Sequence, residues 1–211
     1  MTVELVHVTP NAEELIVKMA RVSAPENESN METAPRLLRY LLKHSHVSPF
    51  EMANMCVAIN TTRGISAQII RHRSFSFQEF SQRYADVAAM GSPEVPQLRR
   101  QDLKNRQNSI DDLTADEKGA YYRRICQIFE DSEHLYREMV SNGVAKECAR
   151  NVLPLASRTR IYMNGTLRSF IHYIQLRESH GTQMEHQIIA KEIKAIFTEQ
   201  FPIIAEAAFS D

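Results

Sequence analysis

The densest group of residues able to do chemistry lies between Arg71 and Tyr84. Arginines, a histidine, serines, amides and a single carboxylate alternate there with aromatic residues. Arginine is a fixed cation whose planar fork binds phosphate or carboxylate through two parallel hydrogen bonds. Phe75 and Phe77 alternate with polar neighbours, which indicates a segment with one packed face and one polar face. The stretch therefore predicts a binding site for a small anionic ligand.

Two other classes of protein compete with this interpretation. The first is a nucleic-acid-binding or nuclease-like protein that contacts phosphates through a set of arginines, namely Arg71, Arg73, Arg83, Arg158 and Arg160. Against it, 25 basic and 26 acidic residues give a net charge of −1, and the sequence has no cluster of carboxylates for Mg²⁺. The second is a helical interaction module without chemistry, which leaves the polar histidine–arginine segment unexplained. We therefore expect no nucleic-acid partner.

Composition favours one globular domain over residues 1–211, a chain of 24.2 kDa. The cysteines Cys56, Cys126 and Cys148 form no CxxC pair, which argues for a reducing compartment and against a disulfide framework or a zinc site. The N-terminus resembles no targeting segment, and no apolar run reaches the roughly 18 residues of a membrane span. We expect a cytoplasmic protein without a membrane partner.

The first part of the chain alternates between strands and helices. Residues 3–8 and 55–59 predict strands, and Thr9-Pro10 and Pro35 predict the starts of two helices. The first of these helices is expected to bury Leu15, Ile16, Met19 and Val22. A further helix after Thr61 or Thr62 would place Gln68, Arg71 and His72 on one face if it continued that far.

The second part of the chain is mainly helical. Residues 85–113 predict a long surface excursion, and the capping box Thr114–Glu117 opens the longest helix. That helix is expected to end at Asn142-Gly143 and to carry an apolar stripe along one side, formed by Tyr121, Ile125, Ile128, Leu135 and Met139. A short helix, a strand over 158–163 and two more helices with buried stripes follow. The order predicts an α+β fold, with a small central antiparallel or mixed sheet packed by helices.

His44 and His46 raise the possibility of a metal site. No cysteine or second acidic residue stands at a supporting spacing, and Pro49 fixes the local backbone. We therefore expect no metal. The sequence also has no glycine-rich nucleotide-binding loop of the Rossmann or P-loop type.

The arrangement Arg71-His72-Arg73, seven residues, Ser81 and then Arg83-Tyr84 resembles the signature of the flavin-dependent thymidylate synthases, the ThyX family. Further segments between about Ala20 and Gln187 are similar to that family; they are His46–Glu51, Ala149–Pro154, Leu167–Ser169, Leu176-Arg177 and Gln183–His186. A long pattern with nearly every position matched is far more specific than a lone glycine fingerprint.

The resemblance implies an activity and its partners. Members of the family make deoxythymidylate from deoxyuridylate (dUMP), with a methylene group from methylenetetrahydrofolate and a hydride carried by FAD, which NADPH reduces. They are homotetramers whose sites combine residues of several subunits, and their fold is a mixed α+β one.

The resemblance also assigns roles to residues. The positions expected to bind FAD are Ser23, Ser48, Arg71, His72, Arg73, Gln78, Glu79, Arg168 and His172. The positions expected to bind dUMP are Gln68, Glu79, Phe80, Ser81, Gln82, Arg83, Arg150 and Arg177.

Arg177 and Ser81 are the expected catalytic residues. Arg177 would lie against the uracil and stabilise the enolate-like charge that builds as carbon 5 is activated. Ser81 would hydrogen-bond the nucleotide without forming a covalent bond, because His72, the nearest base, lies between two arginines that disfavour its taking a proton.

The sequence departs from the family pattern at two positions. Gln78 stands where members more often have asparagine, so the amide is kept but its reach is longer. Gly181 stands where many members have a histidine, which puts a flavin contact from His180 in doubt.

Overall fold

The computed structural model describes residues 1–210, and its internal contacts divide the chain into two compact units. Unit 1 consists of Met1–Ile59, His72–Phe77 and the chain from Tyr162 onward. Unit 2 consists of Asn60–Arg71 and Gln78–Ile161. The single domain expected over residues 1–211 stays a prediction.

Four strands form the main sheet, in the order β1 (Thr2–Val8), β2 (Asn54–Thr62), β6 (Arg158–Thr166) and β3 (Ser76–Glu79). Each of the three expected strands is present, and helices accompany the sheet, so the α+β class is confirmed. Side chains of β6 alternate as expected, with Ile161 and Met163 fully buried and Tyr162 exposed.

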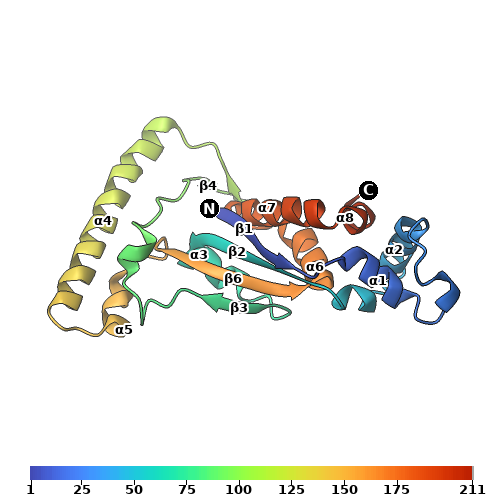
Figure 1. Cartoon of the computed structure of the whole chain (residues 1–211). Helices are drawn as coiled ribbons and strands as arrows, with labels where there is room; N and C mark the ends of the chain where they lie inside the picture. The colour runs from blue at the N-terminus through green and yellow to red at the C-terminus, as the bar shows by residue number, and fades with distance from the viewer. Residues whose placement is uncertain (211) are drawn as a thin grey trace. The chain divides into compact units, whose positions relative to one another are not determined.

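Five α-helices belong to unit 1: α1 (Ala12–Ala20), α2 (Ala34–Lys43), α6 (Leu167–Arg177), α7 (Met184–Gln200) and α8 (Pro202–Phe209). Two short 3₁₀ segments, Pro25–Asn27 and Ser48–Glu51, lie between these elements. Helix α7 contacts β1, α6 and α8, and α8 also contacts α2 (Figure 1). Their apolar faces meet in a core that includes Ile16, Leu38, Phe170 and Phe197.

Two sequence expectations for unit 1 need correction. Val22 was expected to be buried, but α1 ends at Ala20 and the Val22 side chain is 77% exposed. One final helix was expected, whereas the structure has α7 and α8. Pro202 lacks a backbone N–H and therefore suits the first turn of a new helix rather than the interior of a long one.

Unit 2 contains α3 (Arg63–Ile69), α4 (Ala115–Ser141), α5 (Lys146–Ala149) and the 3₁₀ segments Val87–Met90 and Arg150–Val152. Helix α3 ends at Ile69, so the condition under which Gln68, Arg71 and His72 would share one helical face is not met. Helix α4 begins at the expected capping box, where Thr114 and Glu117 bond each other's backbone N–H. It ends as expected before Gly143, whose φ of 85° favours glycine.

The apolar stripe expected along α4 is largely exposed in the single chain. Within α4 only Tyr136 is buried, while Tyr121, Ile128 and Leu135 are 54%, 61% and 44% exposed. The helical period was read correctly, but no other element of unit 2 covers that stripe as a core.

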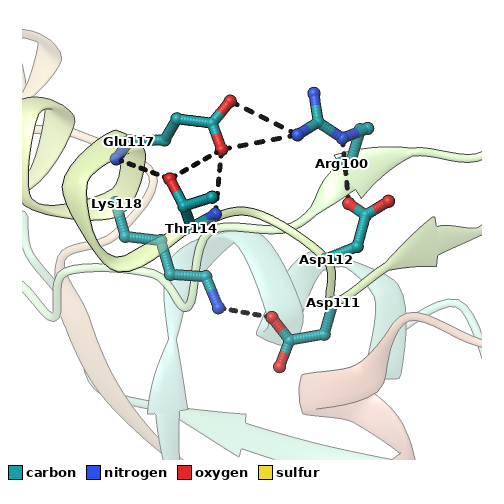
Figure 2. A network of polar contacts seen from close by, with 6 residues as sticks. All are labelled: Arg100, Asp111, Asp112, Thr114, Glu117 and Lys118. Atoms are coloured by element: carbon teal, nitrogen blue, oxygen red, sulfur yellow. Dashed lines mark hydrogen bonds and ion pairs between the residues drawn. The ribbon is translucent and has the colours of Figure 1, made fainter.

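Residues 85–113 contain a small hairpin that the sequence did not indicate. Strand β4 (Arg100–Gln101) pairs antiparallel with β5 (Ser109–Ile110), with Arg100 opposite Ile110. Figure 2 shows how polar contacts connect this hairpin to the start of α4. Arg100 donates to Asp112 at 2.9 Å and to Glu117 at 3.3 Å, and Lys118 pairs with Asp111. The part of the excursion from Arg100 to Asp112 is therefore a hairpin tied to α4 rather than an open loop.

Among residues 1–210, no helix is both long and apolar enough to span a membrane.

Candidate active site

The arginine-rich segment is packed into unit 1 through Phe75. The Phe75 ring is 8% exposed and meets Phe170 edge-on at 4.9 Å between ring centroids. Gly165 of β6 lies directly beneath it, since a Cβ at that position would lie 2.5 Å from the Phe75 ring. Gly165 is therefore needed for the close approach of this ring. The expected alternation is confirmed, because Phe75 is buried while Ser76 and Gln78 are exposed.

His72 and Arg177, which are 105 positions apart in the sequence, meet in unit 1. Arg177 Nε donates to His72 Nε2 at 2.8 Å. Arginine has no acceptor, so His72 Nε2 must present a lone pair; the ring is then neutral and carries its proton on Nδ1. Burial, followed by the charges of Arg177 and His172, lowers the pKa of His72 to about 4.

Two further buried side chains lie against His72. The Tyr173 ring packs edge-on at 4.9 Å, and His186 lies 6.3 Å away between centroids. The Tyr173 hydroxyl and His186 Nε2 are hydrogen-bonded at 2.9 Å, and both residues are 0% exposed. Burial lowers the pKa of His186 to about 3 and raises that of Tyr173. We call His72, Tyr173, Arg177 and His186 the histidine–tyrosine cluster.

A different arrangement holds Glu79 in unit 2. Ser66 Oγ donates to Glu79 Oε1 at 2.7 Å, Thr159 Oγ1 donates to the same atom at 3.0 Å, and Arg63 Nη1 lies 2.5 Å from it. The side chains of Arg63 and Glu79 are only 33% and 19% exposed, so solvent screens this ion pair less than a surface pair. We call Glu79, Arg63, Ser66 and Thr159 the Glu79 clamp.

The segment that follows Glu79 has polar contacts to α5. Arg83 forms an ion pair with Glu147 at 3.0 Å, and Lys146 donates to the backbone carbonyl of Tyr84. The Phe80 backbone N–H donates to the Arg160 carbonyl at 2.9 Å. Gln82 is 7% exposed, whereas the Arg83 side chain is 64% exposed. Arg83 thus presents its cation to solvent while one carboxylate partly neutralises it.

The remaining residues expected on the flavin side are mostly exposed. In unit 1, Arg168 forms an ion pair with Glu51, and Ser23, Ser48 and His172 lie at the surface. In unit 2, Arg71 and Gln78 are exposed, and Gln68 and Arg150 are half-buried. In unit 1, Arg73 is likewise exposed. The structure thus brings His72 and Arg177 into direct contact and leaves several cations accessible to an anionic ligand.

Two other features do not involve the predicted residues. A cleft of about 470 Å³ in unit 1, lined in part by Lys18 and Glu28, includes none of them. Among residues 1–210, no three histidine, cysteine or acidic side chains lie close enough to hold a metal ion.

Sequence reasoning missed five residues of the cluster and the clamp: Tyr173, His186, Arg63, Ser66 and Thr159. One signal could have indicated part of them. Thr159 lies on the buried face of β6, and a polar residue on a buried strand face needs a hydrogen-bond partner. The pairing of Tyr173 with His186 depends on how α6 packs on α7, which local pattern does not determine.

Comparison with known proteins gives a consistent result. The family model described as "Thymidylate synthase complementing protein" (Thy1) matches residues 4–203. The chain is 52% identical over 196 residues to a probable flavin-dependent thymidylate synthase of Paramecium bursaria Chlorella virus 1, covering 93% of this chain and 90% of that protein. It is 46% identical over 195 residues to the flavin-dependent thymidylate synthase of Synechocystis, covering 92% and 88%.

A solved structure agrees with these matches. The crystal structure of a UMP/dUMP methylase from Streptomyces cacaoi, bound with 5-Br dUMP, has a TM-score of 0.87 and 29% identity. The match covers 98% of this chain and 93% of that one. The fold is therefore that of a nucleotide methylase. More narrowly, the chain belongs to the family of flavin-dependent thymidylate synthases.

Proposed function

We propose that the protein converts dUMP to dTMP, with the methylene group of methylenetetrahydrofolate as carbon source and FAD, reduced by NADPH, as hydride source. Its membership of the family supports this activity. The observation that carries it is the bond from Arg177 to His72, because it joins the arginine-rich segment to the arginine expected over the uracil.

The residues available for FAD suit its chemistry. Arg71, Arg73 and Arg168 are exposed cations, and a diphosphate is the kind of anion that arginine forks bind best. Ser23, Ser48, Gln78 and His172 can add neutral hydrogen bonds at the surface. When bound, FAD supplies the hydride-transfer chemistry, which no protein side chain can provide.

The residues of unit 2 suit a nucleotide monophosphate. Arg83 and Arg150 offer cations for the phosphate, while Gln68, Ser81 and Gln82 offer neutral donors and acceptors. Glu79 offers a fixed carboxylate that can accept from a pyrimidine N–H or a sugar hydroxyl. Phe80, which is half-buried, can add an apolar contact.

Arg177 polarises the pyrimidine in this proposal. Carbon 5 of uracil is a poor nucleophile, and it gains electron density when negative charge builds on the ring carbonyl oxygens. A fixed guanidinium next to such a carbonyl stabilises that charge more in the transition state than in the ground state. Arg177 is anchored by a neutral histidine rather than by a carboxylate, so its anchor does not neutralise the charge of the guanidinium.

Ser81 binds the nucleotide and is not a nucleophile in this proposal. A hydroxyl attacks only when an adjacent base takes its proton. The lone pair of His72 Nε2 already accepts from Arg177. Ser81→Ala should therefore raise the KM for dUMP and keep measurable turnover at saturating dUMP; a mass-spectrometric Ser81–nucleotide adduct would contradict this role.

We further propose a homotetramer in which the exposed stripe of α4 packs against another copy of the chain. Tyr121, Ile128 and Leu135 form an apolar surface at helical spacing, and such surfaces mark contacts between proteins. Ile128→Glu should then dissociate the assembly in light scattering, and a wild-type monomer at assay concentration would contradict it. The free cysteines are compatible with a reducing compartment, so we assign the protein to the cytoplasm.

The proposed cofactor and activity are tested with the purified protein. We expect a yellow protein that forms dTMP only with dUMP, methylenetetrahydrofolate and NADPH all present. Arg71→Ala and Arg73→Ala should each weaken FAD binding by roughly tenfold or more, since a hydrogen bond to a charged group contributes about 1.5–3 kcal/mol. Unchanged FAD titrations for both variants would contradict the assignment. Salt-sensitive binding of nucleic acid without bound flavin would favour the nucleic-acid alternative.

A further inference from the structure

The bond between Arg177 and His72 imposes a condition on the His72 ring. Its Nε2 must point its lone pair at the Arg177 Nε–H, and a ring rotated by a half turn would offer other atoms to it. An imidazole has a broad, roughly two-fold torsion about its Cβ–Cγ bond, so the histidine itself does not fix this orientation. Other residues have to hold the ring.

Tyr173 and His186 surround the ring on the side of the core. The Tyr173 plane makes an angle of 78° with His72, and the His186 plane makes an angle of 89° with it. Both are edge-to-face arrangements, which aromatic rings prefer over a parallel sandwich. Tyr173 in turn packs edge-on against Phe75 at 5.9 Å.

The hydrogen bond between Tyr173 and His186 locks these two rings together. Its 2.9 Å length and the complete burial of both residues make it costly to break, because each partner would then be a buried polar group without a partner. His186 Nδ1 already has no hydrogen-bond partner among residues 1–210, so the bond at Nε2 is the one that holds this ring. Helices α6 and α7, which carry the two residues, contact each other.

We propose that Tyr173 and His186 are positioning residues for Arg177. They hold the His72 ring at the angle at which its Nε2 accepts from Arg177, and they thereby fix the direction of the guanidinium. The bond uses Nε, so the two terminal nitrogens of Arg177 are not needed for it and can face a pyrimidine. The role of Arg177 rests on the proposed function, whereas the contacts that fix its direction do not.

The simpler explanation is that Tyr173 and His186 only fill the core. That explanation predicts variants with lower stability but with normal turnover per folded protein. A positioning role predicts lower kcat with little change in the KM for dUMP, because misdirecting Arg177 weakens the transition state more than the bound substrate.

Kinetics of the flavin-loaded enzyme separate the two explanations. Tyr173→Phe removes one hydroxyl and keeps the ring that packs on His72. We expect kcat to fall roughly tenfold, with the KM for dUMP within about twofold and with unchanged FAD content. His186→Leu should act in the same direction, and His186→Gln should recover part of the activity because its amide oxygen can still accept from Tyr173. Tyr136→Phe is the matched control, since it removes a hydroxyl from a buried tyrosine that lies in unit 2, outside the cluster.

A second readout does not depend on activity. Nitrogen NMR of ¹⁵N-histidine-labelled holoenzyme reports which ring nitrogen carries the proton, and His72→Gln identifies the His72 signals by their loss. In the wild type we expect a protonated Nδ1 and a bare Nε2 on His72. In Tyr173→Phe we expect a mixture of both tautomers.

The outcomes are distinguishable. A wild-type His72 with its proton on Nε2 overturns the inference, and so does a Tyr173→Phe enzyme with wild-type kcat. If kcat falls by the same factor in Tyr136→Phe, the effect is general packing and the inference is wrong. If the wild type forms no dTMP at all, the proposed function fails, while the tautomer measurement still tests how His72 is held.

Discussion

The histidine–tyrosine cluster of unit 1 and the Glu79 clamp of unit 2 each fix one charged side chain, but with opposite chemistry. In the clamp, the Glu79 carboxylate is held by a cation, Arg63, and by two hydroxyl groups. In the cluster, the Arg177 cation is held by a neutral imidazole. In the clamp, Arg63 therefore neutralises part of the negative charge of Glu79. In the cluster, the neutral His72 leaves the positive charge of Arg177 fully available to a ligand.

This difference fits two different tasks. A residue that recognises a ligand needs a fixed position, and an ion pair with two hydrogen bonds supplies that. A residue that stabilises charge developing in a transition state needs a fixed position and an undiminished charge. The neutral acceptor meets both needs, but it depends on a histidine that must remain unprotonated.

The largest effect is expected when the charge of the cluster is removed. Arg177→Ala should lower kcat by roughly a hundredfold to a thousandfold, the range seen when one preorganised donor to developing charge is lost. Arg177→Lys is the control, because it keeps a cation but has no Nε–H at the position that bonds His72. The kcat of both variants is measured from turnover at saturating dUMP. A wild-type kcat in Arg177→Ala would contradict the role assigned to the Arg177 charge.

The clamp should respond in affinity rather than in turnover. Glu79→Gln keeps an oxygen that Ser66 and Thr159 can reach, but it leaves Arg63 without its partner charge. We expect dUMP binding, measured by calorimetry, to weaken by roughly tenfold or more, since a hydrogen bond to a charged group contributes about 1.5–3 kcal/mol. A variant that binds dUMP normally but turns over a hundredfold more slowly would mean that Glu79 acts in the chemical step.

The cluster should also make folding sensitive to acid. The pKa of His186 falls from 6.5 in the unfolded chain to about 3 in the fold. Between these two values the imidazole is therefore protonated in the unfolded state and neutral in the folded state. The contribution of this shift to the free energy of unfolding is then fully present above pH 6.5 and is lost as the pH falls toward 3. At pH 5 the loss is about 2 kcal/mol. Urea unfolding at pH 7.5 and pH 5 measures this loss. His186→Leu should show a smaller loss between these two values, and an equal loss would contradict the assignment.

The smallest effects are expected from single hydroxyl groups of the clamp. Ser66→Ala and Thr159→Val each remove one neutral donor to Glu79 and leave the ion pair with Arg63 in place. Each should weaken dUMP binding by a few-fold, in keeping with the roughly 1 kcal/mol net contribution of one hydrogen bond. A loss as large as that of Glu79→Gln would show that the hydroxyls, and not the charge, hold the clamp together.

Much of this arrangement could be predicted from the sequence. Alternation of apolar and polar residues identified β1 and β6, a short apolar run identified β2, and the capping box at Thr114 indicated the start of α4. The arginine-rich segment gave the family, which the comparisons confirm. Each of these signals comes from residues that are close together in the chain, so it can be recognised from the sequence without the structure.

Other features depend on contacts between distant segments. Gly165 is required because Phe75 packs on it, and nothing in its own neighbourhood indicates this. The contact of Arg177 with His72 depends on where α6 ends, and the bond between Tyr173 and His186 depends on how α6 and α7 pack. The stripe of α4 was read correctly as apolar, but the sequence does not show that these side chains stay exposed in the single chain.

The proposed activation of carbon 5 by Arg177 can be measured directly. Replacing the hydrogen on carbon 5 with a methyl group releases that hydrogen, so dUMP tritiated at carbon 5 reports the step. With FAD, methylenetetrahydrofolate and NADPH, we predict that the wild type releases tritium in step with dTMP formation. Arg177→Ala should bind dUMP within a few-fold of the wild type and release tritium at least about a hundredfold more slowly. Equal rates of tritium release by the two proteins at saturating dUMP would contradict the account.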